Sequence, residues 1–130
     1  MRILIAEDDF TSRKFMLRFL SKHGDCDVTV DGEEAIQAFT IALDTGESYD
    51  LICLDIMMPI LDGYEVLKQI RRAERERGIA EDKSVKIIMT TALNEGKNVT
   101  KAFDYGCTAY AGKPIDPQKF ENELRKLGLI

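Results

Sequence analysis

Short apolar runs alternate with amphipathic segments along the whole chain. Residues 3–6, 51–54 and 85–89 are almost continuously apolar, which is typical of strands buried on both faces of a parallel sheet. Residues 26–30 alternate between apolar and polar, which predicts a strand nearer the sheet edge, and residues 108–112 predict a weaker fifth strand.

An amphipathic segment at helical spacing follows each predicted strand. Four of these segments begin near residues suited to capping a helix: Thr11 or Ser12, Asp31, Asp62 and Asp116. Residues 97–105 form a shorter segment, and residues 71–77 predict a solvated helix face with internal ion pairs and no function. Regular alternation predicts an α/β fold with helices on both faces of a five-stranded parallel sheet, a three-layer sandwich.

The central predicted strand ends in a carboxylate, Asp55, and Pro59 stops the strand four residues later. Parallel strands point the same way, so the residues that end them gather at the sheet edge where ligands bind in open α/β folds. We expect this edge to hold Asp8, Asp9, Asp55, Thr91 and Lys113. Each residue alone has an ordinary explanation, such as a helix cap, but their joint occurrence does not.

Three crowded carboxylates raise one another's pKa, and a hard divalent cation relieves their repulsion. Oxygen ligands with few protein contacts suit Mg²⁺. Together with the Thr91 hydroxyl and the Lys113 charge, such a centre suits a phosphoryl group, whose transfer depends on charge neutralisation and positioning. Asp55 is the candidate nucleophile and would form an aspartyl phosphate.

Composition excludes several other functions. The net charge of −5 argues against non-specific binding to nucleic acid or anionic membranes, and no apolar run approaches the roughly 18 residues of a membrane span. The beginning of the chain runs directly into a strand and lacks the features of a signal peptide. Cys26, Cys53 and Cys107 lack Cys-x-x-Cys spacing, and free thiols fit a reducing cytoplasm.

Five motifs are distributed along the chain: Ile-Ala-Glu-Asp-Asp at residues 5–9, Leu-Asp-Ile-Met-Met-Pro at 54–59, Leu-Asp-Gly at 61–63, Thr-Thr-Ala at 90–92 and Lys-Pro at 113–114. By these motifs, and over essentially its whole length, the chain resembles a response-regulator receiver domain of two-component signalling. The resemblance implies a single receiver domain over residues 1–130, with the flavodoxin-like strand order 2-1-3-4-5. It also implies a cis peptide bond between Lys113 and Pro114.

The same resemblance implies roles for the acidic residues. Asp55 would accept the phosphoryl group. Asp9 and Asp55 would bind Mg²⁺ together with the backbone carbonyl of Met57, and Asp8 would act through a water molecule.

The remaining implied roles concern the phosphoryl oxygens and the output surface. Thr91 and Lys113 would contact the oxygens. When phosphorylation draws the Thr91 hydroxyl inward, Tyr110 would follow into the vacated space and change the surface of the fourth helix, fifth strand and fifth helix. The alternative for Tyr110 is a tyrosine at the edge of the core with its hydroxyl in water.

By the same resemblance, a histidine kinase or a histidine phosphotransfer protein donates the phosphoryl group, and a downstream protein binds the changed surface. The chain would catalyse its own phosphorylation and dephosphorylation without being a conventional enzyme. We expect no direct contact with nucleic acid or membranes, and either a monomer or a phosphorylation-dependent dimer. Only residues 128–130 follow the last predicted helix, so the chain is either a stand-alone receiver or part of a larger protein.

The phosphoryl lifetime depends on a water molecule in line with the breaking bond. The side chains best placed to hold this water, Met57 and Leu93, follow Asp55 and Thr91 by two residues, and neither makes a strong hydrogen bond. We therefore expect slow self-dephosphorylation, unless both are loop residues without a kinetic role.

Three other functions compete with this interpretation. A phosphatase of the haloacid-dehalogenase type needs a second Asp at position 57, where the chain has Met57. A flavodoxin-like electron carrier needs a phosphate loop after the first strand, where residues 7–9 would repel the flavin phosphate. A degenerate receiver used only for docking is weakly excluded, because every expected site residue type is present.

Overall fold

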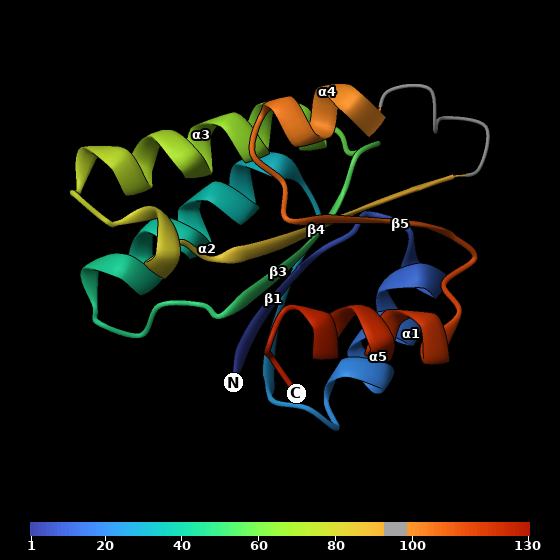
Figure 1. Cartoon of the computed structure of the whole chain (residues 1–130). Coiled ribbons are helices and arrows are strands. Elements are labelled where there is room, and N and C mark those ends of the chain that lie inside the picture. Colours follow the sequence, from blue (N-terminus) through green and yellow to red (C-terminus); the bar gives the residue numbers. More distant parts are fainter. Residues whose placement is uncertain (93–98) are drawn as a thin grey trace.

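The computed structural model describes residues 1–92 and 99–130 and places five strands in one sheet (Figure 1). The strands are β1 Arg2–Ala6, β2 Asp25–Thr29, β3 Leu51–Asp55, β4 Lys86–Ala92 and β5 Ala109–Lys113. The helices are α1 Phe10–Leu20, α2 Gly32–Asp44, α3 Gly63–Glu76, α4 Val99–Asp104 and α5 Pro117–Lys126, with a short 3₁₀ helix, η1, at Glu81–Lys83.

All neighbouring strands pair in parallel, in the order β2-β1-β3-β4-β5. In Figure 1, α2, α3 and α4 cover one face of the sheet and α1 and α5 cover the other. The structure therefore confirms the predicted α/β fold, its flavodoxin-like strand order and its three layers.

The core has two parts because successive residues of a strand point to opposite faces of the sheet. Ile52 and Leu54 of β3 pack with α2, α3 and α4, whereas Leu51 and Cys53 pack with α1 and α5. Every residue of β3 is buried, including Asp55. The strand that ends in Asp55 is therefore the most enclosed part of the sheet.

Aspartate side chains cap four of the helices at their N-termini. Asp31, Asp62 and Asp116 occupy the predicted cap positions. The cap of α1 is Asp9, which accepts a hydrogen bond from the Ser12 amide at 2.9 Å, so the prediction of Thr11 or Ser12 for this position was wrong. Such caps each contribute about 1 kcal/mol to stability.

Among the described residues, no helix is long and apolar enough to cross a membrane. The peptide bond between Lys113 and Pro114 is cis, as predicted.

Candidate functional site

The register of the sheet brings the predicted site residues to one edge. Ala6 of β1 lies beside Leu54 of β3, so the segment that follows β1 continues alongside Asp55. Asp55 pairs with Thr90 of β4, and Ala92 at the end of β4 pairs with Lys113 of β5. Strands β1, β3, β4 and β5 thus each bring a polar residue to this edge.

Three carboxylates lie close together at this edge: those of Glu7, Asp8 and Asp55. One oxygen atom from each lies within 4.8 Å of the others. Glu7 and Asp55 are buried, with exposed fractions of 3% and 4%, whereas Asp8 is exposed. The group combines buried and open ligand atoms, which suits a small cation that keeps part of its water shell.

Asp9 does not belong to this group among the described residues. Its carboxylate caps α1, and the hydrogen bond from the Ser12 amide holds the pKa of Asp9 below its usual value. Glu7 joins Asp8 and Asp55 instead. The site predicted from the sequence did not include Glu7.

A signal for Glu7 is present in the sequence. Ile3 and Ile5 of β1 point to the face covered by α1 and α5, and period-two alternation continues this direction to Glu7. Leu51 and Cys53 of β3 set the same direction for Asp55. The two-residue period of each strand therefore places Glu7 and Asp55 on the face of the sheet that α1 and α5 cover.

In the part of the chain that the structure describes, Lys113 is the cation that contacts Glu7 and Asp55. Its Nζ lies 3.3 Å from Asp55 Oδ1 and also makes an ion pair with Glu7. Burial lowers the pKa of Lys113, but the hydrogen bond to Glu7 and the charges of Asp55 and Glu7 raise it above the usual value overall. Lys113 is therefore a fixed positive charge at neutral pH.

Burial raises the pKa of Asp55 to about 7, and the hydrogen bond and charge of Glu7 act in the same direction. The charge of Lys113 opposes this rise but does not cancel it. Among the described residues, Lys113 is the ammonium group that pairs with the two buried carboxylates, and Asp8 adds a third, exposed carboxylate. The site is short of positive charge, which favours binding of a further cation.

The segment after Asp55 turns sharply back onto β3. The amide of Gly63 donates a hydrogen bond to the carbonyl of Ile56 at 2.8 Å. A Cβ atom at position 63 would lie 2.5 Å from the Asp55 carbonyl oxygen, so only glycine permits this approach. Ile60 has φ of 72°, a strained conformation for a β-branched residue. The loop therefore keeps the backbone around Asp55 in one arrangement.

The other predicted residues have the following positions. Thr91 is buried, next to the end of β4. Met57 is exposed, and Tyr110 is half-buried on β5. Leu93 lies outside the described residues, so its predicted position stays a prediction.

The sequence model of the response regulator receiver domain family matches residues 3–125. The transcriptional regulatory protein ResD of Bacillus subtilis is 35% identical over 127 residues, which are 97% of this chain and 47% of ResD. The chain spans about half the length of the transcriptional regulators that it matches.

Two solved structures show the same similarity. The receiver domain of Ssk1 of Saccharomyces cerevisiae, in complex with the histidine phosphotransfer protein Ypd1, has a TM-score of 0.83 and 28% identity, over 98% of this chain and 88% of that chain. The receiver domain of the sensor histidine kinase PA1611 of Pseudomonas aeruginosa has a TM-score of 0.77 and 25% identity, over 96% of this chain and 94% of that chain. That structure has a magnesium ion coordinated in its active site cleft. The chain belongs to the response regulator receiver domain family of two-component signalling.

Proposed function

We propose that Asp55 accepts a phosphoryl group from a histidine kinase or a histidine phosphotransfer protein. The observation that carries this proposal is the position of the Asp55 carboxylate, which is buried at a strand end, 3.3 Å from Lys113 and within ligand distance of Glu7 and Asp8. An Asp55 oxygen forms the new bond to phosphorus as the bond between phosphorus and the donor's imidazole nitrogen breaks. The imidazole leaves with the electron pair and takes up a proton.

We assign the Mg²⁺ site to Asp8 and Asp55, with the backbone carbonyl of Met57 as a further ligand and Glu7 beside them. Asp8 takes the ligand role predicted for Asp9, because the Asp9 carboxylate is engaged at the N-terminus of α1. Glu7 takes the water-mediated role predicted for Asp8, because it is buried and paired with Lys113. Bound Mg²⁺ would neutralise charge on the incoming phosphoryl oxygens.

Lys113 and Thr91 bind the phosphoryl oxygens in this proposal. The Lys113 ammonium group already contacts Asp55 and can pass to an oxygen of the phosphoryl group on the same carboxylate. The chain thus supplies the positioning and charge for its own phosphorylation, and the donor supplies the reactive phosphorus. Met57 lacks an acid or base group, which argues against a phosphatase that needs one at this position.

The output surface is formed by α4, β5 and α5. Tyr110 packs against the apolar cluster beneath α2, α3 and α4, and its hydroxyl is buried without a hydrogen bond to the described residues. An unpaired buried hydroxyl costs about 1–3 kcal/mol, which favours a second position for this ring. Thr91 and Tyr110 lie on adjacent strands, since Met89, two residues before Thr91, pairs with Tyr110. This placement supports coupling between the site and Tyr110.

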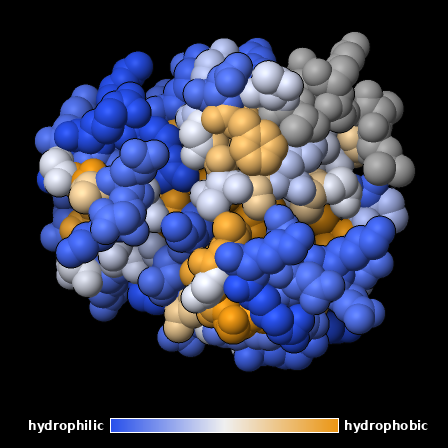
Figure 2. Space-filling model, in the orientation of Figure 1, coloured by the Kyte–Doolittle hydropathy of each residue, from blue (hydrophilic) through white to orange (hydrophobic). Residues whose placement is uncertain are grey.

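A downstream protein would bind this surface. β5 is an edge strand, and a groove of about 450 Å³ runs along β5 and α5, with Tyr110 and Phe120 among its lining residues. In Figure 2, apolar residues lie in the band between the upper and lower helices, and the helix surfaces on either side are mainly hydrophilic. An apolar band with a polar rim is typical of a protein-binding surface.

We also propose that the chain acts as a single receiver domain. It is a monomer or a phosphorylation-dependent dimer. It works in the cytoplasm, a prediction consistent with the free thiols of Cys26, Cys53 and Cys107.

Asp55→Asn abolishes phosphorylation. With acetyl phosphate and Mg²⁺, the wild-type protein gains one phosphoryl group by intact mass, and the variant gains none because an amide is a poor nucleophile. Asp62→Asn is the matched control, since Asn also caps α3 well and Asp62 lies outside the carboxylate group. Phosphorylation of Asp55→Asn at the wild-type rate would show that Asp55 is not the acceptor.

Asp55→Asn also stabilises the protein when Mg²⁺ is removed with EDTA. The folded-state pKa of Asp55 is raised to about 7, above the roughly 3.9 of an unfolded chain, so ionised Asp55 destabilises the fold. The contribution of Asp55 to stability is then most favourable below about pH 4 and falls as the pH rises to about 7. At pH 8 we expect the variant to unfold about 4 °C or more above wild type, the effect of roughly 1 kcal/mol in a domain of this size.

At saturating Mg²⁺, wild type unfolds at a higher temperature than Asp55→Asn, because the cation stabilises wild type and not the variant. Asp9→Asn is the control, because its carboxylate is stabilised at the α1 N-terminus and its loss does not raise the melting temperature. An equal Mg²⁺-induced rise in wild type and Asp55→Asn would contradict the assignment of the cation site.

Beryllofluoride with Mg²⁺ mimics the phosphoryl group and moves Tyr110. We expect NMR shift changes at Tyr110 and in α4 as well as around Asp55, while α2 residues such as Ile41 stay unchanged. The switch is refuted if the changes are confined to the surroundings of Asp55.

The double variant Met57→Asn with Leu93→Glu loses its phosphoryl group faster than wild type. An oriented water lowers the barrier by about 1–3 kcal/mol, which is roughly tenfold to a hundredfold in rate. Decay of the phosphorylated species is followed at equal, saturating Mg²⁺, with Ile41→Asn as a control for an exposed apolar residue outside the carboxylate group. Equal or slower decay in the double variant would mean that these positions do not set the lifetime.

A further inference from the structure

A buried ion pair on α3 lies beside the starts of β4 and β5, at the opposite edge of the sheet from Asp55. Arg71 Nη1 lies 2.8 Å from Glu74 Oε1, and their side chains are only 14% and 4% exposed. The prediction of a solvated face for residues 71–77 was therefore wrong for these two residues, although Arg72 and Arg75 are exposed. Burying charges is costly unless each one is paired and hydrogen-bonded, so the surroundings of this pair need an explanation.

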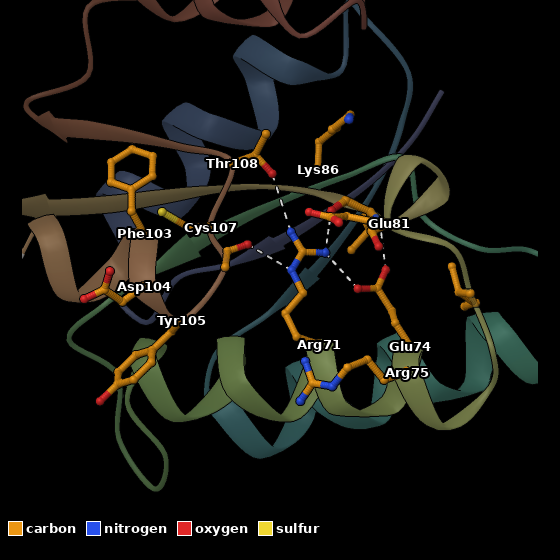
Figure 3. Close-up of a pocket in the computed structure, with 14 residues that line it drawn as sticks. Arg71, Glu74, Arg75, Glu81, Lys86, Phe103, Asp104, Tyr105, Cys107 and Thr108 are labelled. Atoms are coloured by element: carbon orange, nitrogen blue, oxygen red, sulfur yellow. Dashed lines mark hydrogen bonds and ion pairs between the residues drawn. The ribbon is translucent and has the colours of Figure 1, made fainter.

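The pair connects three segments that are far apart in the sequence (Figure 3). Arg71 donates hydrogen bonds to the carbonyl of Val85 at 2.8 Å, just before β4, and to the carbonyl of Gly106 at 2.9 Å, just after α4. The Val85 amide in turn donates to Glu74 Oε2 at 2.8 Å. We call Arg71, Glu74 and these backbone groups the Arg71–Glu74 anchor.

The anchor fixes the turn that ends α4. Gly106 has φ of 102°, and a Cβ atom there would lie 3.2 Å from Arg71 Cγ, so the arginine stem packs directly against the turn. The amides of Tyr105, Gly106 and Cys107 donate to carbonyls within α4, which ties the last helical turn to the same point. An open groove of about 690 Å³ surrounds this network between α3 and the turn, so apolar packing does not enclose the turn on that side.

Strands β4 and β5 begin beside the anchor, and both end at the phosphoacceptor site. β4 runs from Lys86 to Ala92 and carries Thr91, and β5 runs from Ala109 to Lys113. Two hydrogen bonds join the starts of these strands. The Thr108 amide donates to the Ile87 carbonyl at 2.8 Å, and the Thr108 hydroxyl accepts a hydrogen bond from the Ile87 amide at 3.0 Å. The anchor therefore lies at the far end of the two strands that carry Thr91 and Lys113.

We propose that the Arg71–Glu74 anchor is the fixed end of α4, about which the helix pivots when Asp55 is phosphorylated. Arg71 is then a positioning residue for the switch, without contact to the phosphoryl group. This inference rests on the proposed output through α4, β5 and α5. A switch needs an element with two packed arrangements, and a helix fixed at its C-terminal turn can change position only at the end nearer the site.

Arg71→Lys tests the anchor with little disturbance of charge. Lysine keeps a positive charge beside Glu74, but it lacks the planar fork that reaches the Val85 and Gly106 carbonyls together. Arg72→Lys, at the exposed neighbouring position, is the matched control. The paired variant Arg71→Met with Glu74→Met removes both charges, so it leaves no buried charge unpaired.

Amide hydrogen exchange is measured for Tyr105, Gly106 and Cys107 without any ligand. We expect exchange about tenfold faster in Arg71→Lys and in the paired Met variant than in wild type, because the turn loses hydrogen bonds that fix it. Arg72→Lys keeps the wild-type rates. Equal exchange rates in all four proteins would show that Arg71 does not anchor this turn.

The pivot is tested by adding beryllofluoride and Mg²⁺ and comparing amide shifts along α4. In wild type and Arg72→Lys, we expect Thr100 to shift while residues 105–107 keep their ligand-free shifts, and in Arg71→Lys residues 105–107 shift as well. Wild-type changes at residues 105–107 as large as those at Thr100 would overturn the pivot. A wild-type α4 without any response would contradict the proposed switch and the pivot together, while the exchange rates still decide whether Arg71 anchors the turn.

Discussion

Two buried carboxylates share the Lys113 ammonium group at the edge of the sheet where the strands end. Glu7 and Asp55 face the same side of the sheet, and Lys113 contacts both. The arrangement is held by three strands, since the carboxylates follow or end β1 and β3 and the ammonium group ends β5. Asp8 adds a third negative charge at the open side. The resulting shortage of positive charge explains why this edge would bind a cation and a transferable phosphoryl group.

The surrounding structure has to hold these charges in place against their repulsion. β3 is buried along its whole length, so Asp55 cannot move away from its neighbours without disturbing the core. Behind it, Gly63 packs against the Asp55 carbonyl, and Ile60 adopts a strained backbone conformation. Unfavourable backbone and charge arrangements of this kind persist where the fold around them is rigid, and they are typical of functional sites.

The hydrophobic pattern predicted the five strands and five helices, because buried parallel strands are short apolar runs. It also located Asp55, Thr91 and Lys113, since each ends or nearly ends such a run. The acidic segment at residues 7–9 was harder, because three adjacent carboxylates follow β1 and only the direction of the strand decides which ones turn inward. The structure places Glu7 and Asp8 in the group and uses Asp9 as a helix cap.

The partners of the Arg71–Glu74 anchor could not be predicted from the sequence. A mixed-charge run at the end of an amphipathic helix is normally solvated. Helical spacing from Leu67 and Ile70 puts Arg71 and Glu74 on the inward face, but it does not say what they contact there. The inward direction of Arg71 depends on carbonyl groups at Val85 and Gly106, which the fold brings together from distant parts of the chain. Tertiary partners of this kind are visible only once the layers are assembled.

The central claim is that Asp55 carries the phosphoryl group. The most direct measurement is reduction of the phosphorylated protein with borohydride, which converts an aspartyl phosphate into homoserine, followed by peptide mass spectrometry. The account predicts homoserine at position 55 alone, and only when acetyl phosphate and Mg²⁺ were both present. Homoserine at position 8 or 9, or at position 55 without Mg²⁺ and to the same extent, would contradict it.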